Sequence, residues 1–223
     1  MNSKNDTSSS FWNNDQNINW FKTKPSSEYW KDFLVEIENK KIKKVLDLGC
    51  GAGRNTEMIW SLGFNVYGVD LHEDMVSTTM TRMKTLAPEI NWSLRIVQTD
   101  MTSLPYMDGS FDVVLSNGVY HNVSSVEDLE IAIQESARVL SNNGFLCINI
   151  FTSKYIDHNT LEKESSNHLY TTKEGLDMIL ISSEELIAIC DKYNLKLQEN
   201  LTEYVSEVST GKRSVARGVF KKS

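Results

Sequence analysis

Three glycines at alternate positions follow a short apolar run and precede a segment with helical periodicity. They are Gly49, Gly51 and Gly53, and the apolar run covers residues 45–48. Glycines permit a tight turn and let a ligand lie against bare backbone, while the free N–H groups of the next helix favour an anionic group. The pattern predicts a strand, a ligand-binding turn and a helix.

Two acidic residues help to distinguish between ligands of such a turn. Asp47 lies in the predicted strand, and Asp70 ends the next strand roughly 20 residues after Gly49, where a carboxylate can accept hydrogen bonds from ribose hydroxyls. Asp47 would oppose a pyrophosphate and attract an ammonium or sulfonium group. Arg54 occupies the position of the third dinucleotide glycine. These residues favour a cationic nucleoside and disfavour an NAD-dependent oxidoreductase.

The elements that must position the turn alternate along the chain. Apolar runs predict strands at 45–48, 65–69, 94–98, 111–115 and 145–151, and amphipathic segments predict helices at 27–39, 55–62, 73–86 and 124–140. Capping boxes at Ser124-x-x-Glu127 and Ser182-x-x-Glu185 are predicted to open the fourth helix and one further helix that ends near residue 193.

The chain then ends in a predicted hairpin of strands 196–205 and 214–221, joined by a turn at 209–212. Alternation followed by a hairpin predicts an α/β doubly wound fold. We expect a mainly parallel seven-stranded sheet with an antiparallel last strand and helices on both faces.

The length of 223 residues suits one α/β domain. Residues 1–10 are predicted to be a disordered tail and residues 11–223 the domain. An aromatic-rich segment at 11–42 is predicted to form a lid or helix; for Trp12 and Trp20 both interpretations stand, whereas Trp30 and Phe33 favour the core. A polar insertion at 152–181 is a possible substrate cap, with a short helix predicted from Thr171-x-x-Glu174.

Composition restricts the partners and the compartment. The net charge of -7 is expected to repel nucleic acid, and the basic run 40–44 is predicted to be a solvated turn. The three cysteines lack paired spacing and suit reduced thiols, and no histidine pair has metal-ligand spacing, so no metal is predicted. No apolar run approaches the ~20 residues of a membrane span. We expect a cytoplasmic protein without a membrane partner.

These motifs together resemble those of the class I S-adenosylmethionine-dependent methyltransferases, of the type that acts on small molecules. VLDLGCGAGRNT resembles the first family motif, VYGVD the second, and QTDM with LPYMDGSFDVVLSNGVYHNV the third and fourth. The resemblance extends from about Trp30 to the C-terminus, and the terminal hairpin is similar to the family's antiparallel last strand. It implies S-adenosyl-L-methionine as the cofactor and says little about the acceptor.

The resemblance also implies which residues bind the cofactor. They are Asp47, Gly49, Cys50, Gly51, Gly53, Asp70, Leu71, Met75, Asp100, Met101 and Asn117. The glycine turn and Asn117 would contact the methionyl part, with Asp47 near its ammonium, and Cys50 would fill a small-residue position. Asp70 would hold the ribose. Leu71 and Met75 would pack on the adenine, and Asp100 would accept from its amino group beside the Met101 backbone.

The acceptor site is expected at the carboxyl ends of the strands. His121 is the leading candidate for a general base, with a purely structural role as the alternative, and Tyr120 is a candidate for shaping the pocket. The leading function is methyl transfer to a nitrogen or oxygen atom of a small molecule. A peptide or protein acceptor and a non-catalytic cofactor-binding protein are the alternatives. The atom methylated and the oligomeric state are left open.

Overall fold

The computed structural model describes residues 11–12, 14–37, 43–163, 167–208 and 210–223. The predicted disordered tail at 1–10 and most of the basic run 40–44 lie outside the described residues. The helices are α2 (Asp15–Thr23), α3 (Glu28–Ile37), α4 (Arg54–Ser61), α5 (Glu73–Leu86), α6 (Val126–Val139) and α7 (Ser183–Lys192). The strands are β1 (Lys44–Leu48), β2 (Asn65–Asp70), β3 (Ile96–Gln98), β4 (Phe111–Asn117), β5 (Leu140–Ile156), β6 (Leu161–Glu162), β7 (Leu169–Thr171), β8 (Asp177–Ile179), β9 (Leu195–Leu197), β10 (Thr202–Val208) and β11 (Gly211–Lys222).

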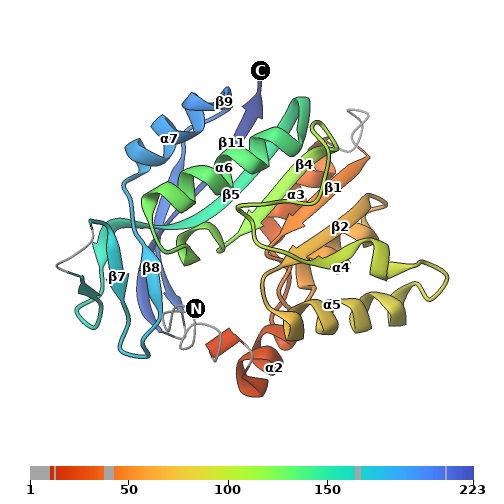
Figure 1. The fold of residues 1–223 in the computed structure, drawn as a ribbon, viewed down its shortest axis with the longest axis horizontal. Coiled ribbons are helices and arrows are strands. Elements are labelled where there is room, and N and C mark those ends of the chain that lie inside the picture. The colour runs from red at the N-terminus through yellow and green to blue at the C-terminus, as the bar shows by residue number, and fades with distance from the viewer. Residues whose placement is uncertain (1–10, 13, 38–42, 164–166, 209) are drawn as a thin grey trace.

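A mainly parallel sheet forms the centre of the molecule (Figure 1). Its strand order is β10-β11-β5-β4-β1-β2-β3, with β9 also paired to β11. The pairs among β1 to β5 are parallel, and β11 is antiparallel to β5, β9 and β10. The α/β class and the antiparallel last strand are confirmed. The predicted count of seven strands is wrong, because the expected strand 196–205 is interrupted at 198–201 and forms β9 and β10.

Helices cover both faces of this sheet and enclose two apolar layers. One layer lies between the sheet and α6 and α7, and the other between the sheet and α3, α4 and α5. Trp30 is fully buried in the second layer and Phe33 packs against it, so their assignment to the core is confirmed. The alternation of side chains along each strand sends neighbouring residues into opposite layers, as with Val45 and Leu46.

The insertion at 152–181 forms a small antiparallel sheet in the order β6-β7-β8. The short helix predicted from Thr171 is wrong. Gly175 has a φ of +81° and turns the chain back, and the Thr171 hydroxyl donates to Asp177 across the turn at 2.6 Å. The apolar residues after this turn pack on Phe151 of the central sheet. This long-range packing outweighs the local capping signal.

Helix starts depend on which serine meets a free backbone N–H. The box at Ser182 is confirmed, because Ser182 Oγ accepts from Glu185 N at 3.2 Å and Glu185 Oε2 accepts from Ser182 N at 2.8 Å. The box at Ser124 is wrong by one residue: Ser125 caps α6 by accepting from Asp128 N at 3.0 Å. Within the described residues, no helix is both long and apolar enough to cross a membrane.

Candidate functional site

The three glycines form a left-handed turn between β1 and α4. Gly49, Gly51 and Gly53 have φ values of +72°, +54° and +82°. A Cβ atom on Gly49 would lie 2.3 Å from Val119 Cγ2, and one on Gly53 would lie 2.9 Å from Thr79 Oγ1. A Cβ atom on Gly51 would meet no described atom within 4 Å. Gly49 and Gly53 therefore permit close packing, whereas the backbone of Gly51 faces open space.

Asp70 connects the turn to the end of the neighbouring strand. Its Oδ2 accepts from Gly51 N at 2.9 Å and its Oδ1 accepts from His72 N at 3.0 Å. Burial raises the pKa of this carboxyl group. Each carboxylate oxygen has a second lone pair, and the side chain is only partly buried, so Asp70 can still accept from a hydroxyl group.

Asp47 lies beneath the turn, with 1% of its surface exposed. It accepts from Thr56 Oγ1 at 2.6 Å, and burial raises its pKa to about 6. Direct contact with an ammonium group is not open to it in this conformation, so its charge would act from below the turn. Cys50 is also buried, and burial raises the pKa of its thiol, which therefore stays protonated. Its Cβ lies 3.1 Å from where a Cβ on Gly68 would be.

The two residues expected at the adenine differ in exposure. Leu71 is 54% exposed, whereas Met75 is 2% exposed and packs with Ile18 of α2 and with Ala52. The Trp12 ring packs against the same cluster and lies 6.2 Å from the ring of His72. The N-terminal segment therefore lies over the glycine turn and the start of α5 (Figure 1). The aromatic residues of segment 11–42 indicated a lid or a helix there, but not that Trp12 and Ile18 would pack beside Met75.

Asp100 is exposed in the loop that follows β3. Its Oδ1 accepts from both N and Oγ1 of Thr102 at 2.8 Å, and its Oδ2 accepts from no described residue. Met101 is partly buried and packs against the apolar layer beneath α6. Asp100 therefore keeps one carboxylate oxygen without a partner among the described residues, and the next residue, Met101, packs on the apolar core.

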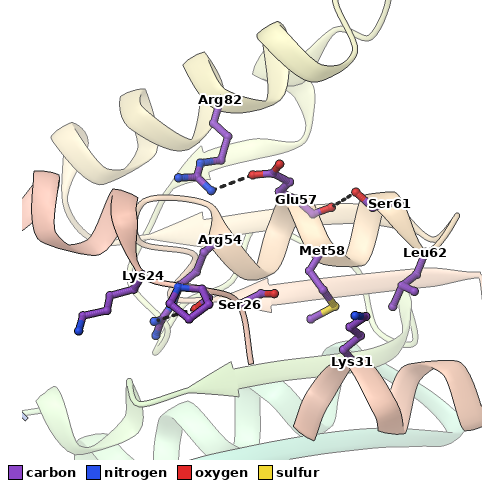
Figure 2. A pocket seen from close by; sticks show the side chains of 10 residues that line it. Lys24, Ser26, Lys31, Arg54, Glu57, Met58, Ser61, Leu62 and Arg82 are labelled. Atoms are coloured by element: carbon purple, nitrogen blue, oxygen red, sulfur yellow. Dashed lines mark hydrogen bonds and ion pairs between the residues drawn. The ribbon is translucent and has the colours of Figure 1, made fainter. Parts of the chain in front are cut away.

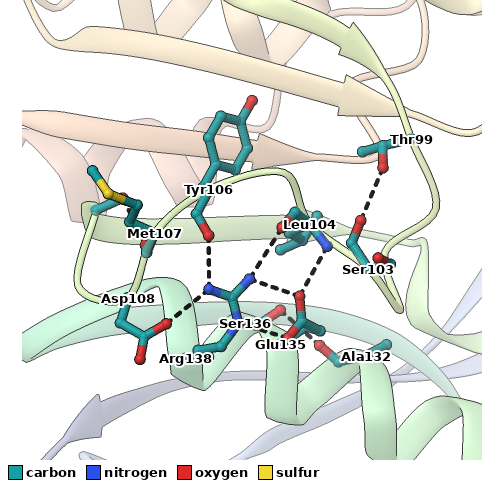
Figure 3. Close-up of polar contacts among 11 residues, drawn as sticks. Thr99, Ser103, Leu104, Tyr106, Met107, Asp108, Ala132, Glu135, Ser136 and Arg138 are labelled. Carbon is teal, nitrogen blue, oxygen red and sulfur yellow. Dashed lines mark hydrogen bonds and ion pairs between the residues drawn. The ribbon is translucent and has the colours of Figure 1, made fainter.

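Arg138 of α6 holds this loop in place, as Figure 3 shows. Its guanidinium donates to the carbonyls of Tyr106 at 2.7 Å and Leu104 at 3.0 Å, and pairs with Asp108 at 2.9 Å. Glu135 completes the cluster by accepting from Leu104 N at 2.9 Å. No local pattern in the sequence indicates this contact, because about one helix and one loop of the chain separate Arg138 from Tyr106 and Leu104.

Asn117 ends β4 and links it to α3. Its Oδ1 accepts from Trp30 Nε1 at 3.1 Å, and the following Gly118 donates its N–H to Asn149 O at 2.7 Å. Asn117 is partly exposed at the carboxyl edge of the sheet, on the strand adjacent to the glycine turn. The structure therefore brings Gly49, Asp70 and Asn117 to one edge.

Tyr120 and His121, the candidates for shaping the acceptor pocket and for a general base, are both buried. Tyr120 is fully buried, and its hydroxyl bonds to Ser136 Oγ at 2.6 Å. His121 is 4% exposed, stacks on Phe151 with ring centroids 3.9 Å apart, and accepts from Phe151 N through Nδ1 at 3.3 Å. Burial and the nearby charge of Arg213 lower the pKa of His121 to about 3. Its Nδ1 is occupied, so the structural role is the better description.

A hollow of about 360 Å³ lies elsewhere, on the outer side of α4 (Figure 2). Lys24, Lys31 and Arg54 line it, and Arg82 at its rim pairs with Glu57 at 2.8 Å. None of the predicted cofactor residues contributes to this surface. The candidate site is instead the carboxyl edge of the sheet, where the glycine turn, Asp70 and Asn117 lie.

Comparisons with known proteins place this site in context. The family model described as "Methyltransferase domain" matches residues 46–148. A ubiquinone biosynthesis O-methyltransferase of Pelagibacter ubique is 27% identical over 184 residues, which cover 76% of this chain and 69% of that protein. An eEF1A lysine and N-terminal methyltransferase of Mus musculus is 26% identical over 154 residues, which cover 56% of this chain but 21% of that protein.

Solved structures share the fold. The 1,6-didemethyltoxoflavin-N1-methyltransferase of Burkholderia thailandensis, solved with 1,6-didemethyltoxoflavin and S-adenosylhomocysteine, has a TM-score of 0.69 at 19% identity, covering 99% of this chain and 87% of that one. An S-adenosylmethionine-dependent methyltransferase from Clostridium acetobutylicum has a TM-score of 0.66 at 16% identity, covering 91% of this chain and 94% of that one. At such identities the likeness concerns the fold alone.

Proposed function

We propose that this chain, a class I S-adenosylmethionine-dependent methyltransferase, transfers the methyl group to a nitrogen or oxygen atom of a small molecule. The class and the cofactor agree with the methyltransferase domain at residues 46–148. The small-molecule acceptor is supported by the likeness to a ubiquinone biosynthesis O-methyltransferase, of which the chain spans 69%. The acidic surface implied by the net charge of -7 also favours an acceptor other than nucleic acid.

The residues at the carboxyl edge of the sheet suit the cofactor. Gly51 presents backbone without a side chain, and no described atom lies where its Cβ would be. Asp70 offers a partly exposed carboxylate to the ribose hydroxyls, and Asp100 offers a free oxygen to the adenine amino group. Asp47 supplies negative charge beneath the turn for the methionyl ammonium. Leu71 is exposed and can contact the adenine ring directly. Met75 is buried against α2, so it would support the adenine only indirectly.

The chain's own contribution to the chemistry is alignment. S-adenosylmethionine supplies a methyl group that is already activated by positively charged sulfur. The protein has to hold the acceptor atom about 3–3.5 Å from that carbon and to exclude water. We assign the covering role to α2 and to the β6–β8 sheet, which lie beyond the same edge of the central sheet in Figure 1. The burial of His121 and the bond to its Nδ1 favour the structural role for this residue, so we propose an acceptor that needs no base, such as a neutral amine or an ionised hydroxyl.

A transfer experiment tests the acceptor class. A cell extract is divided by ultrafiltration into small molecules and macromolecules, and each fraction is incubated with the enzyme and S-adenosylmethionine that carries a labelled methyl group. We expect the label in the small-molecule fraction, with none transferred by Asp70→Ala, whose folding is checked by circular dichroism. Label found in macromolecules alone would replace the proposal with the peptide or protein alternative. Cofactor binding without transfer to either fraction would favour the non-catalytic alternative.

A further inference from the structure

Arg217 of β11 is partly buried and has no acidic partner among the described residues. Its guanidinium lies 4.4 Å from the ring centroid of Tyr29 in α3 and 4.7 Å from that of Tyr204 in β10. Its Nη2 donates to the Tyr204 hydroxyl, while its Nε is buried without a hydrogen-bond partner among the described residues. None of the ion pairs in the described part of the chain includes Arg217.

Two other partly buried arginines have acidic partners, whereas Arg54 and Arg95 donate to a backbone carbonyl and to an amide oxygen. Arg82 pairs with Glu57 at 2.8 Å, and Arg138 pairs with Glu135 at 2.7 Å. The chain has 30 acidic residues against 23 basic ones, so acidic partners are abundant. A partly desolvated cation without a counter-charge is unfavourable. Its retention beside the site is explained if the counter-charge belongs to a ligand.

The strand registers place Arg217 in one row across the sheet with Asn117, at the carboxyl edge where we place the cofactor. Asn117 of β4 is opposite Asn149 of β5, and Asn149 is opposite Arg217 of β11. Neighbouring strands are about 4.8 Å apart, so the Cα atoms of Asn117 and Arg217 are separated by roughly 10 Å. One small molecule can span that distance. Adjacent residues of α3 mark both ends of the row, because Trp30 bonds to Asn117 and Tyr29 lies against Arg217.

The chemistry of this arrangement selects an oxyanion. The two tyrosine rings hold the guanidinium plane, which reduces the entropy lost when it forms directed hydrogen bonds. Nη1 has no acceptor among the described residues and can donate to an anionic group, whereas Nε is enclosed by the protein. Carboxylate and phosphate oxygens match such donors and form charge-assisted hydrogen bonds.

We propose that Arg217, held between Tyr29 and Tyr204, binds a carboxylate or phosphate group of the methyl acceptor. This inference rests on the proposed function, because it assigns the ligand of Arg217 to the acceptor. The methyl acceptor is then a small anionic molecule. Its anionic group lies at Arg217 and its nucleophilic atom lies near Asn117. Arg217 orients that molecule and takes no part in proton transfer.

Calorimetric titration with simple probes tests the proposal. Benzoate, phenyl phosphate and the neutral analogue benzamide are titrated into the full chain, with and without saturating S-adenosylhomocysteine. We expect at least one anion to bind and benzamide not to bind. The better of the two anions identifies whether a carboxylate or a phosphate is preferred. Arg217→Gln should raise the Kd of the anion at least tenfold, and Arg217→Lys should have a smaller effect because it keeps the charge but loses the planar fork.

Arg95 provides a matched control at the other end of the sheet. Its guanidinium also lies near aromatic rings, 5.4 Å from Tyr67 and 5.7 Å from Trp92, and its partner is Asn65. Arg95→Gln should leave the anion affinity unchanged, and melting curves show whether each variant is folded. The proposal is overturned if neither anion binds the wild type, or if Arg217→Gln binds as tightly as the wild type. Failure to bind S-adenosylhomocysteine, with anion binding intact, would instead contradict the proposed function.

Discussion

At the scale of single residues, two buried ionisable groups have pKa values shifted by the same cause and with opposite consequences. Desolvation disfavours the charged form, so it raises the pKa of Asp47 to about 6 and lowers that of His121 to about 3. Asp47 therefore ionises close to neutral pH, while His121 stays neutral throughout the physiological range. We therefore expect Asp47 to make cofactor affinity sensitive to pH, and His121 to make stability sensitive to pH.

We expect S-adenosylhomocysteine to bind several-fold more tightly at pH 7 than at pH 5. Its ammonium keeps its charge over this range, whereas Asp47 changes from mostly neutral to mostly ionised as the pH rises through about 6. Calorimetric Kd values at half-unit intervals would measure the effect. In Asp47→Asn the affinity should be lower and its pH dependence smaller. An identical slope in this variant would assign the dependence to another group, with Asp70 the first to consider because burial also raises its pKa.

His121 should make the fold less stable in acid. Its pKa in the folded chain, about 3, lies below the value of about 6.5 expected when unfolded, so the stability it contributes is present above pH 6.5 and is lost as the pH falls. Between pH 7.5 and pH 5 this loss amounts to about 2 kcal/mol. Urea unfolding of the wild type and of His121→Asn at both pH values would measure it. Asn does not titrate, so its smaller acid loss is the expected difference.

At the scale of elements, the turn after β1 combines packing and binding in neighbouring glycines. Gly49 and Gly53 are restricted by Val119 and Thr79, whereas Gly51 faces open space. Gly63, at the end of α4, has a φ of +86° and is also free of described atoms within 4 Å of a built Cβ. Gly51 and Gly63 thus share a left-handed backbone conformation and open local space, but they differ in their distance from the proposed cofactor.

This pair gives a controlled test of the turn. Gly51→Ala and Gly63→Ala should each lose about 1–2 kcal/mol of stability, because both place a Cβ in the left-handed region. Only Gly51→Ala should also weaken S-adenosylhomocysteine binding, by tenfold or more, since its methyl group would occupy the ligand face of the turn. Denaturant unfolding and calorimetry measure the two effects separately. Equal cofactor affinity in both variants would contradict the assignment of Gly51.

We propose that two further elements restrict access to the same edge. The α2 helix packs Ile18 on Ala52 and Met75, and the small sheet packs Tyr170 and Met178 on Phe151. Neither contact is a continuation of the parallel sheet. Both put side chains from distant parts of the sequence beyond the carboxyl ends of the strands, where water has to be excluded.

At the scale of the whole molecule, the cofactor should stabilise the chain against unfolding. A ligand at 100 times its Kd adds about 2.7 kcal/mol, which corresponds to roughly 5–10 °C in Tm for a domain of this size. We expect this shift with S-adenosylmethionine and with S-adenosylhomocysteine, and none with NADH. A thermal melt in the presence of each ligand measures it. A shift with NADH alone would contradict the cofactor assignment.

Local signals in the sequence accounted for most of the elements around the cofactor edge. The predicted helix at 73–86 has the observed bounds, and the box at Ser182 forms as expected, because capping and periodicity depend on residues a few positions apart. The glycine turn was predictable for the same reason: its left-handed φ values require residues without a Cβ. The sequence could not decide which of Ser124 and Ser125 caps α6, because two adjacent serines are equally suited to one cap.

By itself, the sequence determined the strand–turn–helix unit, the alternation that makes the sheet parallel and the identity of the acids at its edge. Tertiary structure alone decided that Tyr120 and His121 are buried, that the insertion is a small sheet and that Arg217 lies between Tyr29 and Tyr204. The physical reason is the length of chain between the partners. Burial and cross-strand register depend on which distant segments pack together, and local propensity carries no information about that choice.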